Sequence, residues 1–150
     1  MKVSIGADHG GVLYKEKIKE YFKDKVEFID VGSYEIISDD NYAEISLRVG
    51  EQVKNGTAEY GIMICRTGVG AVIALNKIQG IRAGLLETID GIKLARSKNN
   101  INVLSFGADN ISVKKAIKIV DIFLNTAFDG GRHEARLKVI ADYEKEHSKK

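Results

Sequence analysis

The only cysteine of the chain, Cys65, stands where a short apolar run meets a glycine-rich turn. The run before it is Tyr60-Gly61-Ile62-Met63-Ile64, and the residues after it are Arg66-Thr67-Gly68-Val69-Gly70. This order is typical of a buried strand, a sharp turn and a helix whose small first residues let a ligand approach closely. Because ligands of α/β folds bind at the carboxyl ends of strands, facing helix N-termini, the thiol is a candidate for chemistry.

The turn does not fit either common phosphate-binding motif. A P-loop requires Gly-Lys-Ser or Gly-Lys-Thr, whereas Ala71 follows Gly70. A dinucleotide-binding turn requires a third small residue where Ile73 stands, although Glu87 lies at about the right distance for a ribose-binding acid. The remaining interpretation is a run of backbone N–H groups, from Arg66 to Ala71, that points at an oxyanion or a phosphate.

Two interpretations of the Cys65 side chain stay open. The helix dipole, the N–H groups of the turn and the Arg66 guanidinium would favour the thiolate, which suits proton abstraction beside a carbonyl or nucleophilic attack. A free cysteine at the end of a strand is also often a small buried hydrophobic residue. The residues of this stretch alone favour neither interpretation.

Two further groups of polar residues could serve the same site. Asp8 and His9 follow the first predicted strand, and parallel strands end at one edge of a sheet, so we expect them near Cys65. Arg132 and Arg136 are spaced i, i+4 on the last predicted helix, which places both guanidinium groups on one face as a phosphate clamp. Taken singly, a helix N-cap is the commoner role for Asp8, and solvent exposure is commoner for the other three.

The elements that must position these groups alternate between strands and helices. Strands are expected at about 3–7, 26–31, 60–65, 81–87 and 101–106. Helices are expected after the first and third strands and at about 43–54, 89–97, 112–124 and 132–145, and the segment 34–42 is expected to be a loop that could cover a site. This alternation predicts an α/β fold: a three-layer, Rossmann-like domain with a five-stranded parallel sheet and a C-terminal helix.

Apolar residues at helical spacing predict which helix faces are buried. The first helix carries an apolar set among charged residues, made of Leu13, Ile18, Tyr21 and Phe22. In the last helix the residues expected to face inward are Leu137, Ile140 and Tyr143.

Composition limits the possible classes of function. The chain has 150 residues, so we expect residues 1–150 to form one domain. A formal charge of +2 argues against a strong field for nucleic acid or a membrane surface, and no apolar run reaches the roughly 18 to 20 residues of a transmembrane helix. A lone cysteine and no visible signal peptide favour a cytoplasmic protein. His133 and His147 show no metal-ligand spacing, so no metal site is expected.

Four motifs follow one another along nearly the whole chain. They are Asp8-His9-Gly10-Gly11; Cys65-Arg66-Thr67-Gly68-Val69-Gly70 with Asn76-Lys77 and Gly80-Ile81-Arg82; Asn99 with Asn102-Val103-Leu104; and Gly130-Gly131-Arg132-His133-Glu134-Ala135-Arg136. Together they resemble the type B ribose-5-phosphate isomerases and the related galactose-6-phosphate isomerase subunits. The joint occurrence of the four motifs is far more specific than any one of them.

The resemblance implies an aldose–ketose isomerase of a phosphorylated sugar that works through a cis-enediolate without a metal or cofactor. Ribose 5-phosphate is the first substrate to try. Cys65 would be the base that moves the proton between C1 and C2. The other implied roles are enediolate binding by Thr67 and the N–H groups of Gly68, Val69 and Gly70, contact with substrate hydroxyls by Asp8, phosphate binding by His9, Arg132 and Arg136, and substrate binding by Asn99. The family also implies a homodimer or homotetramer whose active sites are shared across a subunit interface.

The chain departs from the family pattern at three places. Arg66 stands where the family typically has glycine, which adds Arg66 to the candidate substrate-binding residues. Lys98 stands where the family typically has the histidine thought to open the furanose ring, which makes Lys98 a candidate catalytic residue. A lysine amine can donate a proton, but it is a poor proton shuttle at neutral pH unless burial changes it. The usual Tyr-Pro pair before the second helix is also missing.

These departures leave two alternative functions. The substrate could be another aldose phosphate, either open-chain or of different size, such as a tetrose or hexose phosphate. The protein could also bind a sugar phosphate without catalysis, which would keep His9, Arg132 and Arg136 but predict no exchange of the C2 proton. An NAD-binding domain is disfavoured by Ile73 and by the length of the chain.

Overall fold

Strands and helices alternate along the chain in a computed structural model that describes residues 1–35 and 39–148. The strands are β1 (Lys2–Ala7), β2 (Glu27–Asp30), β3 (Tyr60–Cys65), β4 (Ala83–Leu85) and β5 (Val103–Gly107). The helices are α1 (Val12–Tyr21), α2 (Tyr42–Lys54), α3 (Val69–Leu75), α4 (Ile89–Asn99), α5 (Val113–Asn125) and α6 (Arg132–Glu146). All strand pairs are parallel, in the order β2-β1-β3-β5-β4, so the predicted five-stranded parallel sheet is confirmed.

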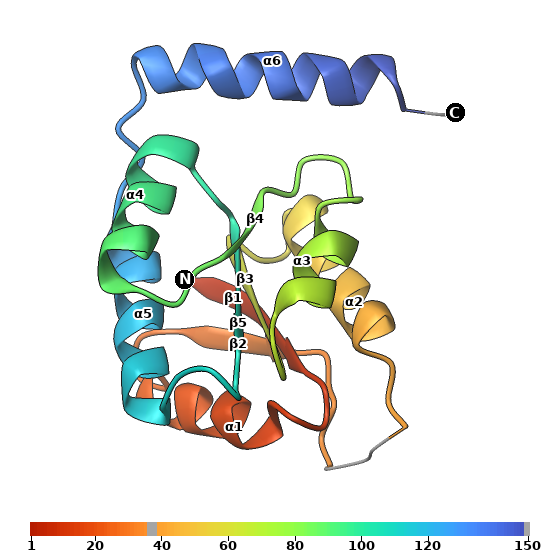
Figure 1. Ribbon diagram of the computed structural model, residues 1–150, viewed down its shortest axis with the longest axis vertical. Helices are drawn as coiled ribbons and strands as arrows, with labels where there is room; N and C mark the ends of the chain where they lie inside the picture. The colour runs from red at the N-terminus through yellow and green to blue at the C-terminus, as the bar shows by residue number, and fades with distance from the viewer. Residues whose placement is uncertain (36–38, 149–150) are drawn as a thin grey trace.

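The sheet is covered on both faces, which gives the predicted three layers (Figure 1). Helices α1, α4 and α5 pack on one face around a large apolar cluster, and α2 and α3 pack on the other around a smaller one. Because side chains alternate along a strand, β3 contributes to both clusters. Ile62 and Ile64 enter the larger cluster, whereas Met63 and Cys65 enter the smaller.

Helix α6 lies apart from the sheet and contacts the chain near the end of α4 (Figure 1). The expectation that its apolar residues face inward is wrong for Ile140 and Tyr143, which are 59% and 64% exposed, and Leu137 is only half-buried. The reason is that both faces of the sheet are already covered by other helices. Helical spacing identifies an apolar face, but it does not identify what covers that face. Leu13 and Tyr21 of α1 are also exposed, contrary to expectation.

Element boundaries differ from the predictions by a few residues. Strand β4 is shorter than predicted, and α2 begins at Tyr42, where the Asn41 carboxamide accepts hydrogen bonds from the N–H groups of Ala43 and Glu44. The predicted loop 34–42 includes residues 36–38, which lie outside the described residues. Over the part of the chain that is described, no helix combines the length and the apolar character needed to span a bilayer.

A buried ion pair joins α1 to the end of β2. The Lys15 side chain is fully buried, and its Nζ donates to both carboxylate oxygens of Asp30, at 2.8 and 2.9 Å, and to the Ser33 carbonyl at 2.6 Å. Lys19 donates to the same carboxylate at 2.8 Å. Burial acts to raise the pKa of Asp30, but hydrogen bonds from the two lysines and from the Gly32 N–H lower it below its ordinary value.

We predict that Asp30→Asn destabilises the fold by about 3–5 kcal/mol, because it leaves the buried Lys15 ammonium without its counter-charge. Urea denaturation at neutral pH measures this. The lowered pKa of Asp30 means that its contribution is present above the unfolded pKa of about 3.9 and is lost as pH falls further. The matched control is Glu20→Gln, which breaks the exposed pair with Lys23 and should cost less than about 1 kcal/mol. Equal stability of the two variants would contradict the assignment.

Candidate active site

The register between β1 and β3 brings the first two candidate motifs together. Ala7 pairs with Ile64, and the Asp8 N–H donates to the Ile64 carbonyl at 3.1 Å. Asp8 therefore lies beside Cys65 at the carboxyl edge of the sheet, as the sequence predicts. The alternative role of Asp8 as the N-cap of the first helix is wrong, because Gly11 occupies that position.

The turn after Cys65 has the sharp form expected from its glycines. Gly68 has a φ of +85°, in the left-handed region that favours glycine, and α3 begins at the next residue. The Gly68 N–H donates to the Cys65 sulfur at 3.1 Å, so this N–H group points at the thiol rather than into open space. Thr67 is exposed at the tip of the turn.

These residues line a pocket of about 230 Å³ at the carboxyl edge of the sheet. Its walls are formed by Asp8, Tyr42, Cys65, Arg66, Thr67 and Gly70. The volume is below the roughly 300–1,000 Å³ of typical small-molecule sites.

Tyr42 is a pocket residue that sequence reasoning missed. It begins α2 and reaches across to the turn, where a Cβ atom added at Gly70 would lie 2.3 Å from the Tyr42 ring. The available signal was an aromatic residue directly after an N-cap asparagine at a predicted helix start. The packing of α2 against α3 decides that this side chain enters the pocket.

Burial controls the acidity of Cys65. The side chain is 5% exposed, and burial raises the pKa of the thiol; the N–H groups of Gly68, Thr67 and Ala71 lower it, and the negative charge of Asp8 raises it further. The net direction is upward, so the expectation that the surroundings favour the thiolate is wrong. Cys65 belongs to the apolar cluster under α2 and α3, which confirms that it is a buried residue, and it also lines the pocket, where its role in chemistry stays a prediction.

Arg66 does not sit against the Cys65 sulfur. Its Nε donates to the Asp109 carboxylate at 3.0 Å, and its side chain is 63% exposed. Asp109, which holds the Arg66 side chain, follows β5, and no pattern in the sequence pairs positions 66 and 109. Arg66 therefore forms part of the exposed rim of the pocket.

His9 is held by an acid from a distant part of the chain. Its Nδ1 lies 3.0 Å from the Asp40 carboxylate, and this hydrogen bond raises the pKa of His9 above its ordinary value. Asp40 also accepts a hydrogen bond of 2.7 Å from the Ser33 hydroxyl. Burial raises the pKa of Asp8, whose carboxylate accepts from the Gly10 N–H at 2.9 Å. A protonated His9 fits the predicted role in binding a phosphate.

Asp8, His9 and Asp40 also form the one group of three acidic or histidine side chains, within the described residues, that could hold a metal ion. Their ligand atoms lie within 4.8 Å of one another. Each of the three already accepts or shares a hydrogen bond within the chain. The expectation of no metal site remains a prediction.

The remaining predicted residues gather at the opposite edge of the sheet. Helix α4 runs antiparallel to the strands, so Lys98 and Asn99 at its end lie near the amino end of β5. Arg132 and Arg136 begin α6, and the Asp129 N–H just before it donates to the Ser97 carbonyl at 2.9 Å. All four side chains are exposed, and none lines the Cys65 pocket. We call this set, Lys98, Asn99, Arg132 and Arg136, the amino-edge group.

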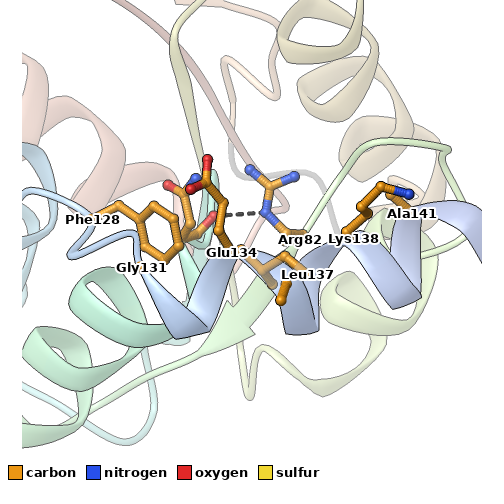
Figure 2. Close-up of a pocket in the computed structure, with 9 residues that line it drawn as sticks. Arg82, Phe128, Gly131, Glu134, Leu137, Lys138 and Ala141 are labelled. Atoms are coloured by element: carbon orange, nitrogen blue, oxygen red, sulfur yellow. Dashed lines mark hydrogen bonds between the residues drawn. The ribbon is translucent and has the colours of Figure 1, made fainter.

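His133 lies among the cations of the amino-edge group. It is buried, and burial lowers its pKa, as do the positive charges of Lys98, Arg132 and Arg136. A larger hollow of about 690 Å³ opens on the same side, between α6 and the body of the chain. Figure 2 shows Arg82, Phe128, Glu134 and Leu137 among the residues that line it. Amino-edge cations and an open hollow thus lie away from the thiol pocket of the same chain.

Several residues of the four motifs have structural roles. The Asn76 carboxamide exchanges two hydrogen bonds with the backbone of Ala83, at 2.8 and 3.0 Å. Asn102 accepts from the Arg82 N–H and donates to the Gly80 carbonyl. Glu87, considered for a ribose, accepts from the Gly107 N–H at 2.9 Å instead. Asn76, Asn102 and Glu87 thus hold the loops around β4 and β5 in place.

Comparison with known proteins identifies one family over most of the chain. The model of the family described as Ribose/Galactose Isomerase matches residues 3–140. Ribose-5-phosphate isomerase B of Escherichia coli is 37% identical over 95% of this chain and 96% of its own. A structure of ribose-5-phosphate isomerase B from Clostridium thermocellum has a TM-score of 0.95 and 38% identity, covering 99% of this chain and 100% of that one. The Mycoplasma genitalium enzyme with bound ribulose 5-phosphate has a TM-score of 0.93 and 38% identity, covering 97% of each chain.

We predict that Cys65 titrates above the ordinary cysteine pKa of about 8.5 and that Asp8→Asn lowers its midpoint, because the substitution removes a neighbouring negative charge. The rate of alkylation by iodoacetamide as a function of pH measures the midpoint, and a single cysteine makes the adduct unambiguous. Asp142→Asn, on α6, is the matched control and should leave the midpoint unchanged. A wild-type midpoint below the ordinary value, or no shift in Asp8→Asn, would show that burial and Asp8 do not set the acidity.

Proposed function

Because the chain belongs to the ribose/galactose isomerase family, we propose that it interconverts an aldose phosphate and a ketose phosphate, with ribose 5-phosphate and ribulose 5-phosphate as the pair. The observation that carries the proposal is the pocket in which Cys65, Asp8 and Thr67 meet in a member of this family. The substrate is a small sugar phosphate, and the free thiol suits a reducing compartment such as the cytoplasm.

Cys65 acts as the base in the proposed mechanism. Its thiolate removes the proton from C2 of the open-chain aldose, and the resulting thiol returns a proton to C1, while the O2 proton passes to O1. The cis-enediolate formed between these steps carries negative charge on its oxygens. We assign Thr67 and the N–H groups of Val69 and Gly70 to stabilisation of that charge, whereas the Gly68 N–H, also expected from the sequence to bind the enediolate, donates to the Cys65 sulfur and would stabilise the thiolate.

The raised pKa of Cys65 has two opposite effects on this step. Burial makes the thiolate a stronger base once it forms, which favours removal of a weakly acidic C–H proton. Burial also lowers the fraction of thiolate at neutral pH. Asp8, beside the sulfur, contacts the substrate hydroxyls, and burial raises its own pKa above the ordinary value.

Active sites in the proposed assembly are shared between two copies of the chain. Support comes from the separation between the amino-edge group and the Cys65 pocket, which lie at opposite edges of the sheet. One chain by itself cannot bring the two together around a single ligand. A second copy supplies Asn99, Arg132 and Arg136 to the pocket, where the two arginines bind the phosphate with His9. The exposed apolar residues Ile140 and Tyr143 of α6 then become buried in the homodimer or homotetramer.

Lys98 takes the ring-opening position in this scheme. Its side chain is exposed at the end of α4 on the single chain, and a lysine amine is a poorer proton shuttle near neutral pH than the imidazole of a histidine. We therefore expect ring opening to be slow relative to proton abstraction. An aldose phosphate that is already open-chain, such as a tetrose phosphate, is the alternative substrate that this residue favours.

We predict that the protein exchanges the C2 proton of ribose 5-phosphate with solvent and that Cys65→Ala lowers turnover by at least about 100-fold, since it removes the general base. Release of a labelled C2 proton, measured over a panel of aldose phosphates, reports activity and substrate together. Glu20→Gln, which changes an exposed charge on α1 away from the pocket, is a matched control and should leave turnover unchanged. Binding without exchange would indicate a non-catalytic protein, and a Cys65→Ala variant within a few-fold of wild type would exclude this base.

We predict that two inactive variants complement each other when they are co-expressed. Cys65→Ala and the double variant Arg132→Ala/Arg136→Ala disable different halves of a shared site, so random pairing should restore about a quarter of wild-type activity. Cys65→Ala with Asp8→Asn is the control, because both changes fall in the same half and should restore nothing. Sedimentation measures the assembly in parallel. Failure of the first mixture to recover activity would place all the groups in one chain.

A further inference from the structure

Arg66 is the pocket residue whose position the fold does not explain. Its side chain is 63% exposed and contributes to neither apolar cluster. It lines the pocket with Cys65 and Thr67, in a place where the resembled family typically has glycine. A long cation at this position is therefore exposed to whatever the pocket binds.

The Arg66 side chain is held along its length. Its stem packs over Gly10, where an added Cβ atom would lie 2.5 Å from the Arg66 Cγ. Its Nε donates to the Asp109 carboxylate at 3.0 Å, and the Asp109 N–H donates back to the Arg66 carbonyl at 3.1 Å. Among the described residues, no hydrogen-bond partner is recorded for its two terminal nitrogens, Nη1 and Nη2. The guanidinium is thus oriented by Nε and keeps its outer donors for a ligand.

We propose that Arg66 is a specificity-determining residue that binds the substrate phosphate from within the same chain as Cys65, through Nη1 and Nη2. The proposal rests on the proposed function. The Cys65 side chain is 5% exposed and that of Arg66 is 63% exposed, so the thiol lies at the pocket floor and the guanidinium at its rim. A sugar phosphate with C2 at the thiol extends its far end, which carries the phosphate, toward the rim.

The charges around Arg66 suit a phosphate dianion. His9 lies close enough to Arg66 for the two charges to interact: hydrogen bonding to Asp40 raises the pKa of His9, and the positive charge of Arg66 acts to lower it. Asp8 and Asp109 are the neighbouring acids. The exposed pair of Arg66 with Asp109 contributes little by itself, whereas two parallel N–H donors to a phosphate form a charge-assisted contact of high specificity. Asp109 accordingly orients the guanidinium and does not compete strongly with the phosphate.

Calorimetric titration with inorganic phosphate and kinetics with ribose 5-phosphate test this role. Arg66→Gln keeps the stem as far as Cδ, which packs over Gly10, and removes the guanidinium with its charge. We expect it to raise the phosphate Kd and the KM by about 10- to 100-fold, with kcat within about three-fold of wild type. Arg66→Lys keeps the positive charge but lacks the two parallel N–H donors of the guanidinium, so it should recover part of the lost phosphate affinity. C2 proton exchange in unphosphorylated ribose should be the same in wild type and Arg66→Gln.

Lys23→Ala is the matched control, because it removes another exposed, ion-paired cation and should change neither the phosphate Kd nor the KM. A phosphate Kd in Arg66→Gln within two-fold of wild type, an equal loss in Lys23→Ala, or a fall in kcat at constant KM would overturn the assignment. The phosphate titration needs no turnover. A chain that binds phosphate through Arg66 but isomerises no sugar would therefore refute the proposed function and leave this inference standing.

Discussion

The parallel pairing of β1 with β3 is the constraint on which the candidate site depends. It sets Ala7 opposite Ile64 and lets the Asp8 N–H bond the Ile64 carbonyl, so Asp8 and the thiol of Cys65 meet at one edge. A slip of one residue in β3 would turn Cys65 to the opposite face of the sheet, under α1 and α5. The close approach of α1 reinforces the register, because a Cβ atom at Gly11 would lie 2.5 Å from the Ile64 oxygen.

A chain of polar contacts extends this order from the core to the pocket. Lys15, fully buried, binds Asp30 and the Ser33 carbonyl; the Ser33 hydroxyl donates to Asp40; and Asp40 bonds His9. The partners come from α1, from the end of β2 and the stretch after it, and from the residues just before α2, so the contacts tie the buried ion pair to the position of His9. Such a network stabilises the fold only when every polar group in it has a hydrogen-bond partner.

Chain direction explains why the predicted site residues fall into two groups. In βαβ units the helices run back along the sheet, so residues that end a strand and residues that end a helix lie at opposite edges. Cys65 ends β3, whereas Asn99 ends α4. Arg132 begins α6, the helix that follows the end of α5, so it lies on the same side as Asn99. The same geometry leaves α6 outside the three layers with its apolar residues exposed (Figure 1). A site that needs both groups favours assembly of two copies over rearrangement within one.

By itself, the sequence determined the parallel sheet and the meeting of Asp8 with Cys65, because strand alternation and strand ends are local patterns with one geometric outcome. Only the tertiary structure decided that Asp40 holds His9 and that Arg66 turns to Asp109, since those contacts join residues whose spacing along the chain carries no signal. Burial, too, is a property of the packed chain: it reversed the expected shift in the acidity of Cys65. Local patterns specify what each segment prefers, whereas distances between segments and access of water to a group arise only when all the segments pack together.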